Sequence, residues 1–168
     1  MKRILLQALG YALFAALIGY FSSQPPYRHL ASDRAVVKLS LSHAGERKQE
    51  CRQRTPEELA KLAPNMRAQL DCPRERADVR VELEMDGRLL AAVQAPASGL
   101  RHDLPSTIYR RIEVPAGSHR FRARLADTAP GDLRHQREAT IELAPGRVLV
   151  VDFAASKGGF LFTHGGPP

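Results

Sequence analysis

The first apolar segment of the chain is nearly continuous. After Lys2 and Arg3, every residue from Ile4 to Phe21 is apolar, aromatic or glycine except Gln7. As a helix, these 18 residues extend about 27 Å, close to the roughly 30 Å hydrocarbon core of a bilayer. The pattern predicts a transmembrane signal anchor over residues 4–22, with residues 1–3 as a cytoplasmic head.

A cleaved signal peptide is the main alternative to an anchor, and a buried helix of a soluble protein is a weaker one. The exit of the apolar run, residues 17–23, lacks the small-x-small pattern that a signal peptidase cuts. Basic residues flank the run on both sides, so the positive-inside rule is nearly balanced. The short basic head is typical of an export signal. We therefore expect a single-pass protein of the bacterial inner membrane with its C-terminal domain in the periplasm.

Further along the chain, the apolar positions change to a period of two. Residues 79–85 alternate between apolar and charged side chains, as in a strand with one buried and one solvated face. Asp86-Gly87 follows, which is a typical two-residue hairpin turn, and residues 88–93 form the returning strand. This segment predicts a β-hairpin.

The same alternation recurs in several other segments. It predicts strands over residues 37–41, 108–114, 121–125, 139–143, 148–153 and 160–162. We interpret Pro115–Ser118 and Ala144–Gly146 as the turns of a second and a third hairpin. The strand over residues 148–153 is apolar enough to be central, and residues 160–162 form a short edge strand.

Seven or eight short strands joined by turns are typical of an antiparallel β-sandwich, so the expected fold class is mainly β and Ig-like. The sandwich domain is expected over residues 34–164. A linker over residues 23–33 precedes it, and a flexible tail over residues 165–168 follows it.

The two cysteines, Cys51 and Cys72, are the only ones in the chain. In an exported domain such a pair predicts one disulfide, which would contribute roughly 3 kcal/mol by closing a loop of about twenty residues. A metal or redox pair is the alternative, but C-x-x-C is absent and no histidine lies between the cysteines.

A helical insertion is predicted over residues 55–70, between the cysteines. Thr55, Pro56 and Glu58 have the spacing of a capping box with proline at the first helical position. Pro64 should kink or split the helix. An apolar stripe follows the cap, formed by Leu59, Leu62, Met66 and Leu70. We expect an amphipathic helix lying across a sheet; the alternative is a kinked element that docks a partner helix.

Two stretches of the chain resemble the sequences of a known family. They are Val81-Glu82-Leu83-Glu84-Met85-Asp86-Gly87-Arg88 and Val114-Pro115-Ala116-Gly117-Ser118-His119-Arg120-Phe121. Together, over residues 79–125, they resemble PEGA-like and related carboxypeptidase-regulatory-like β-sandwich modules. The resemblance implies an extracytoplasmic sandwich used for binding or spacing, and it implies no functional residues.

The chain has 168 residues, which is too short for a multidomain enzyme. Its formal net charge of +7 means that basic side chains outnumber acidic ones. We expect a basic interaction patch formed by Arg110, Arg111, Arg120, Arg122 and Arg124. Anionic headgroups or an acidic protein would fit it, and an ordinary solvated face is the alternative. Nucleic acid is disfavoured, because the aromatic residues that stack on bases are missing from this face.

Candidate chemistry is sparse. The motifs G-x-S-x-G, H-E-x-x-H and the P-loop are absent, so no catalytic residue, cofactor or metal site is predicted. His119 continues the inward set of its strand and is expected to be packed or hydrogen-bonded. The other histidines are His29, His43, His102, His135 and His164, and only His102-Asp103 with His164 is considered for a surface metal site.

These observations favour a non-catalytic, membrane-anchored accessory protein that binds the inner membrane and another envelope protein. A metal or cofactor carrier, with histidines, Met66 and the cysteines as ligands, is the second hypothesis. An extracytoplasmic hydrolase is the third, because catalytic groups can come together from distant positions.

Overall fold

A computed structural model describes residues 2–24, 30–128 and 131–166. The chain divides into two compact units, residues 1–31 and 32–168. The predicted linker falls partly outside the described residues, as does His29, and so do the last two residues of the predicted tail.

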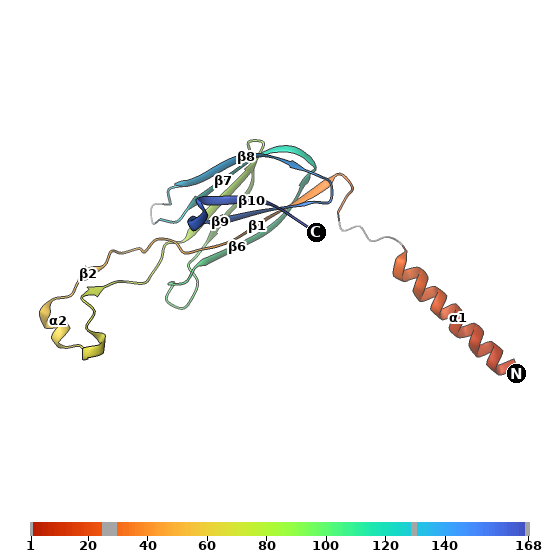
Figure 1. The fold of residues 1–168 in the computed structure, drawn as a ribbon, viewed down its shortest axis with the longest axis horizontal. Coiled ribbons are helices and arrows are strands. Elements are labelled where there is room, and N and C mark those ends of the chain that lie inside the picture. Colours follow the sequence, from red (N-terminus) through yellow and green to blue (C-terminus); the bar gives the residue numbers. More distant parts are fainter. Residues whose placement is uncertain (1, 25–29, 129–130, 167–168) are drawn as a thin grey trace. The chain divides into compact units, whose positions relative to one another are not determined.

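The first unit contains the helix α1, Lys2–Ser23, whose 22 residues confirm the predicted apolar helix (Figure 1). All of its described residues are exposed, and its mean hydropathy is 1.9. By length and composition it can cross a membrane, as both anchors and signal sequences can. An apolar helix of this kind together with a disulfide indicates an extracytoplasmic location.

The second unit contains two packed four-stranded sheets, which confirms the mainly β fold. The first sheet has the order β10-β9-β1-β6 and the second β5-β4-β7-β8. Their strands are β1 (Arg34–His43), β4 (Val79–Met85), β5 (Arg88–Ala95), β6 (Ser106–Pro115), β7 (Gly117–Ala126), β8 (His135–Leu143), β9 (Val148–Ala154) and β10 (Gly159–Gly165). Neighbouring strands are antiparallel except β1 and β9, which are parallel.

The core lies between the two sheets. Alternate residues of each strand face inward, as the period of two predicts, and the largest fully buried side chains include Phe121, Phe160 and Leu39. The hairpin at Asp86-Gly87 is confirmed: both residues have positive φ, 52° and 77°, which the tight turn between β4 and β5 requires. The central position of β9 and the edge position of β10 are confirmed as well.

The second and third predicted hairpins are wrong. β6 pairs with β1 and β7 with β4 and β8, so the turn at Pro115–Ser118 crosses from one sheet to the other. The turn at Ala144–Gly146 does the same between β8 and β9. Alternation shows which side chains face the core, but strands of facing sheets alternate in the same way as hairpin partners. The period of two therefore could not distinguish a hairpin from a corner.

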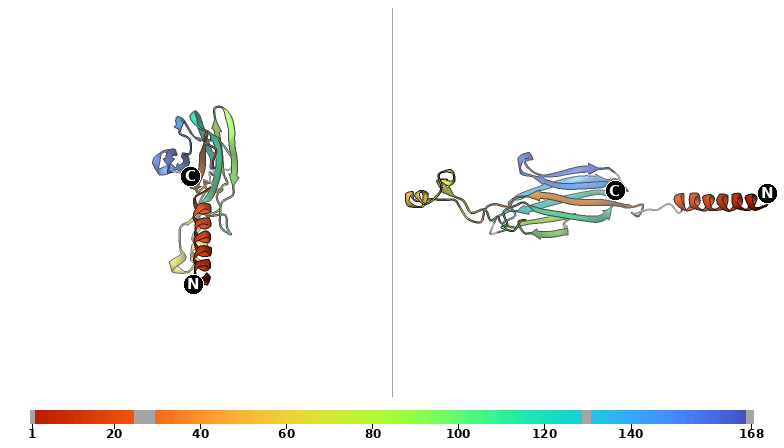
Figure 2. Two further views of the ribbon diagram at one scale, coloured as in Figure 1. Left: turned by 90° about the vertical axis from the view of Figure 1, so that its right-hand side faces the viewer. Right: turned by 90° about the horizontal axis from the view of Figure 1, so that it is seen from below.

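Residues 46–76, here called the arm, lie between β1 and β4 and extend from the end of the sandwich opposite the start of β1 (Figure 1; Figure 2, right). The arm contains β2 (Arg52–Gln53), α2 (Pro56–Ala60), the short 3-10 helix η1 (Pro64–Met66) and β3 (Leu70–Asp71). The predicted split at Pro64 is confirmed, and the helical part is shorter than residues 55–70.

The expectation that this helix lies across a sheet is wrong. The structure describes the whole arm, and none of its residues is buried. α2 has only five residues, which offer too little apolar surface to pack stably on a sheet. The ribbon of β2 and β3 holds α2 away from the sandwich instead.

Candidate functional site

The arm is attached to the sandwich by close backbone packing at Gly45. A Cβ atom at this position would lie 2.2 Å from the carbonyl oxygen of Ala77 and 3.3 Å from that of Asp127, so only glycine fits without a backbone shift. The amide of Glu46 donates to the Asp127 carbonyl at 2.8 Å, and the amide of Ala77 donates to the Glu46 carbonyl at 2.8 Å. The base of the arm is therefore fixed to the end of β7.

Arg76 fastens the segment of the arm that returns from β3 to β4. Its Nη1 donates to the Gly45 carbonyl at 2.9 Å and its Nε to the Asp103 carbonyl at 3.1 Å. Its own amide donates to the carbonyl of His102, whose Nδ1 in turn lies 3.0 Å from the Ala97 carbonyl oxygen. One arginine thus connects the arm to the loop between β5 and β6.

Two histidines converge on one buried carboxylate beside this attachment. The Nε2 atoms of His43 and His135 lie 2.9 and 3.3 Å from Oδ2 of Asp127, whose side chain is only 8% exposed. A carboxylate only accepts hydrogen bonds, so both imidazoles donate. The ring of Phe153 contacts both imidazoles, with centroid distances of 4.8 and 5.2 Å.

The neighbours of Asp127 set the pKa of its carboxyl group. Burial acts to raise the pKa of Asp127, but the hydrogen bond from His43 and the charge of His135 outweigh it and hold the pKa below its ordinary value. Arg134 contacts Asp127 at 3.6 Å and Glu46 at 2.7 Å. The cluster therefore ties β1, β8 and the first residue of the arm together.

The neck of the arm is held by the predicted disulfide between Cys51 and Cys72, which the structure confirms. Beyond it, β2 and β3 pair over two residues, Arg52 with Asp71 and Gln53 with Leu70. The carboxylate of Asp71 lies 3.0 Å from both Arg52 and Arg54. A covalent bond and exposed ion pairs, rather than apolar burial, maintain this ribbon.

The tip of the arm begins at the predicted capping box, which is confirmed. Thr55 accepts from the amide of Glu58, and the Glu58 carboxylate accepts from the amide of Thr55. Hydrogen bonds from Arg52 and then from the Thr55 amide lower the pKa of Glu58. The start of α2 is therefore ordered by hydrogen bonds and one ion pair rather than by burial.

The apolar stripe of the tip is open to solvent. Met66 is 64% exposed and Leu70 52%, while Leu59 and Leu62 are half-buried. Large apolar side chains on a braced, protruding segment are the kind of group that anchors a protein–protein contact. The stripe was visible in the sequence, but its exposure was not.

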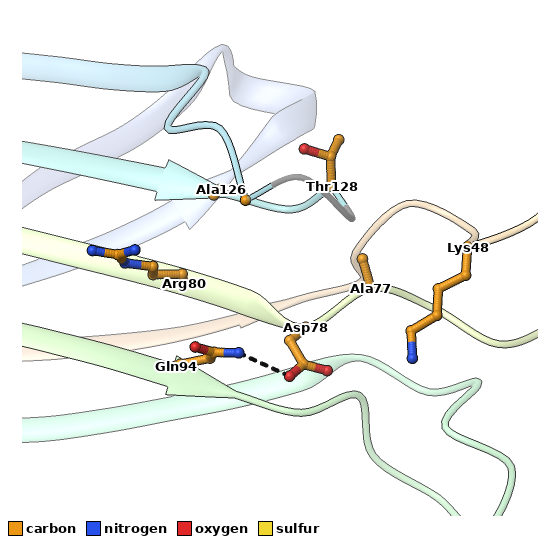
Figure 3. A pocket seen from close by; sticks show the side chains of 8 residues that line it. Lys48, Ala77, Asp78, Arg80, Gln94, Ala126 and Thr128 are labelled. Carbon is orange, nitrogen blue, oxygen red and sulfur yellow. Dashed lines mark hydrogen bonds between the residues drawn. The ribbon is translucent and has the colours of Figure 1, made fainter.

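A polar groove of about 380 Å³ lies beside the base of the arm. Lys48 and Asp78 point into the same space, and Gln94 donates to Asp78 at 3.0 Å (Figure 3). The Lys48 ammonium also contacts Glu75 at 2.6 Å, and this hydrogen bond raises the pKa of Lys48. Hydrogen-bond donors and acceptors line the groove together with Ala77 and Ala126, so it suits a polar or peptide-like segment.

The arginines of β7 lie on the outer face of their sheet, as predicted, but they are paired. Arg124 contacts Glu82 at 2.9 Å, Arg122 contacts Glu138 at 3.1 Å, and Arg120 contacts the same glutamate at 3.5 Å. These contacts form a ladder across β4, β7 and β8 in which acid and base alternate. The face is therefore a solvated ion-pair network more than a free positive surface.

Arg110 and Arg111 do not join this face. They lie on β6, in the other sheet, because β6 pairs with β1. Arg111 contacts Glu113 on its own strand at 3.0 Å, and Arg110 donates to the neighbouring carbonyl of Tyr109. The five predicted patch arginines thus lie on two different sheets.

His119 is hydrogen-bonded, as expected. Its Nδ1 lies 2.7 Å from Oδ2 of Asp86, whose other oxygen accepts from the amide of Arg120 at 2.9 Å. The hydrogen bond from the Arg120 amide, followed by that from His119, lowers the pKa of Asp86. This pair fastens the Asp86-Gly87 turn to β7.

The residues considered for metal binding do not come together. His102 lies near the arm, whereas His164 pairs with Leu149 near the start of β9. In the part of the chain that the structure describes, no three His, Cys, Asp or Glu side chains are arranged to hold a metal ion. The disulfide also occupies both cysteines, which therefore cannot act as thiolate ligands.

One arrangement has the composition of a hydrolytic triad. Ser106 is the cross-strand partner of His43, which contacts Asp127. Ser106 is 0% exposed, so a substrate carbonyl cannot approach its hydroxyl in this conformation. The group is consequently part of the packing at the end of the sandwich.

Comparisons with known proteins add no relatives. No protein-family model matches the chain, and no curated protein is significantly similar to it. The resemblance of residues 79–125 to PEGA-like modules stays a prediction.

Sequence reasoning missed the cluster of His43, Asp127 and His135, because its members are far apart in the chain. The only signal was that His43 continues the inward positions of its strand.

Proposed function

We propose that this chain is a non-catalytic accessory protein of the bacterial envelope, anchored in the inner membrane by α1, whose periplasmic sandwich presents the arm to another envelope protein. The observation that carries the proposal is the arm: a braced, protruding segment whose apolar tip is exposed. The PEGA-like resemblance, which implies a module for binding or spacing, agrees with this function.

The bracing of the arm favours binding over a passive loop. A disulfide, a capping box and ion pairs order a segment that contributes no buried residue, in the part of the chain described, to the core. A segment ordered before binding loses less conformational entropy when it meets a partner. Met66 and Leu70 would then be the anchor residues, and the polar groove would form the rim of the contact.

The connectivity of the chain also supports this role. α1 connects to the start of β1, and the arm leaves from the end of β1, on the opposite end of the sandwich. Within the second unit, the ten-residue strand β1, about 33 Å long, separates the first residues of the sandwich from the base of the arm. The arm is therefore presented at the end of the sandwich opposite the start of β1.

The test is site-specific photo-crosslinking in intact cells. A photoreactive residue at Met66 should give one recurrent adduct with an envelope protein, whereas the same residue at Tyr109, which is 54% exposed on β6, should not. A chain that forms no adduct from the arm, or equal adducts from both positions, would contradict the proposal.

A pair of charge substitutions provides the matched control. Leu70→Asp should abolish the adduct, while Leu89→Asp should leave it intact, because Leu89 is similarly exposed, at 58%, but lies on β5. Both variants should be retained in the membrane fraction at the level of the original protein, since neither side chain is part of the core. Loss of the adduct in both variants would show a general effect on the protein.

A further inference from the structure

The disulfide of the arm lies at the surface. Cys51 is exposed and Cys72 is half-buried, and the ribbon around them has no buried residue among the described positions 46–76. A disulfide in a core is protected from thiols until the protein unfolds. This one is open to attack in the folded state.

One sulfur of the bond has a cationic partner. Nη1 of Arg47 donates to Sγ of Cys51 at 3.4 Å, and Arg47 forms no ion pair with any residue that the structure describes. The neighbouring arginines Arg52 and Arg54 are instead occupied by Glu58 and Asp71. The guanidinium of Arg47 is therefore available to stabilise negative charge on Cys51.

We propose that Cys51–Cys72 is a thiol–disulfide exchange site, reduced by a dithiol, in which Cys51 is the leaving group. The thiolate of the reductant attacks Sγ of Cys72, a new sulfur–sulfur bond forms there, and the Cys51–Cys72 bond breaks. The electron pair of the broken bond stays on Cys51 as a thiolate beside Arg47. The second thiol of the reductant then displaces Cys72, so the arm gains two thiols and the reductant becomes a disulfide.

The direction of attack follows from the position of Arg47. A thiol leaves faster when its thiolate is more stable, and a neighbouring arginine lowers the pKa of a thiol. Attack on Cys51 would instead expel Cys72, for which the structure shows no corresponding donor among the described residues. Cys51 is therefore the favoured leaving group although it is the more exposed of the two.

Reduction would change the arm more than the sandwich. β2 and β3 pair over only two residues, and a two-residue ladder does not persist without further support. Loss of the disulfide would release the tip from its ordered form. The inference goes beyond the binding function proposed above, because the chemistry is the same whatever the arm contacts.

The first experiment measures the rate of reduction by dithiothreitol in the full-length protein, held in mild detergent and followed by mass-tagging of free thiols. Arg47→Gln should slow the reaction about two- to five-fold, and Arg47→Lys should restore most of the rate. Arg67→Gln makes the same charge change elsewhere in the arm, where Arg67 binds the Leu62 carbonyl, and should leave the rate unchanged. Equal slowing in Arg47→Gln and Arg67→Gln would show that the rate depends on the overall charge of the arm and not on the position of Arg47, which would overturn the proposal.

The second experiment locates the mixed disulfide. After brief exposure to glutathione and alkylation of free thiols, peptide mass spectrometry should find glutathione on Cys72 and the alkyl group on Cys51. Glutathione mainly on Cys51 would overturn the assigned direction. A disulfide that reacts only in denaturant would overturn the exchange site itself, without bearing on the crosslinking result that tests the binding function.

Discussion

The sandwich and the arm belong to the same compact unit but are held together by different interactions. The sandwich has a continuous apolar core in which side chains such as Phe121, Leu39 and Val81 are fully buried. The arm has no buried residue among its described positions and depends on one disulfide, a capping box and exposed ion pairs. Burial of apolar surface supplies most of the stability of a fold, whereas exposed ion pairs supply little.

This difference separates the roles of the two regions. Side chains of the arm can change without unfolding the sandwich, so the exposed residues Met66 and Leu70 are free to serve a contact. The connection between the regions is concentrated in a few groups: Gly45, Arg76 and the cluster around Asp127. Substitutions in each region and at their junction can therefore measure how independent the two regions are.

The largest effect is expected from the core. Phe121→Ala removes a fully buried ring and should lower the free energy of unfolding by about 3–5 kcal/mol. Met66→Ala, on the arm, should change it by less than about 0.5 kcal/mol. Urea unfolding of the full chain in mild detergent, followed by circular dichroism, measures both. Similar losses in the two variants would show that the arm is part of the cooperative core.

Removal of the disulfide should have a large but local effect. In the chain-entropy model, a loop of this size contributes roughly 3 kcal/mol, and we expect Cys51→Ser with Cys72→Ser to lose it within the arm. Hydrogen exchange should accelerate for the amides of β2, α2 and β3 and stay unchanged in β4 and β7. Acceleration throughout β4 would contradict this separation.

Gly45→Ala should disturb the attachment of the arm. The added Cβ would meet the backbone at Ala77 at 2.2 Å, and relieving the clash should cost about 1–3 kcal/mol. Gly166→Ala is the control, because a Cβ there meets no described atom within 4 Å. Thermal unfolding compares the variants, and an unchanged Gly45→Ala protein would show that the backbone at this junction yields readily.

The smallest effect is a pH dependence of the Asp86-Gly87 turn. The folded-state pKa of Asp86 is lowered by the Arg120 amide and His119, so its stabilising contribution is present above the unfolded pKa of about 3.9 and is lost as the pH falls through the folded value. Asp86→Asn keeps a residue that tolerates positive φ but has no titrating carboxyl. Compared at about pH 6 and about pH 3, the urea midpoint of the variant should fall less than that of the original protein. An equal fall in both proteins would exclude Asp86 as a source of the acid sensitivity.

Much of the local structure was determined by the sequence alone. The apolar run at Ile4–Phe21, the alternation around Val81, the Asp86-Gly87 turn and the capping box at Thr55 each depend on residues a few positions apart. The chain's own geometry decides such features, because helix periods, strand periods and turn conformations are local properties. The single pair of cysteines made the disulfide predictable for a different reason: there was only one pairing to choose.

The tertiary structure decided which segments meet. β6 and β7 have the alternation of a hairpin, yet the closure of two sheets around one core places them on opposite layers, and with them Arg111 and Arg122. The same closure brings His43 and His135 to Asp127 and directs the arm away from the sheets. These outcomes depend on long-range burial and backbone pairing. Many segments could pair with the same partner, and no local sequence pattern determines which of them does.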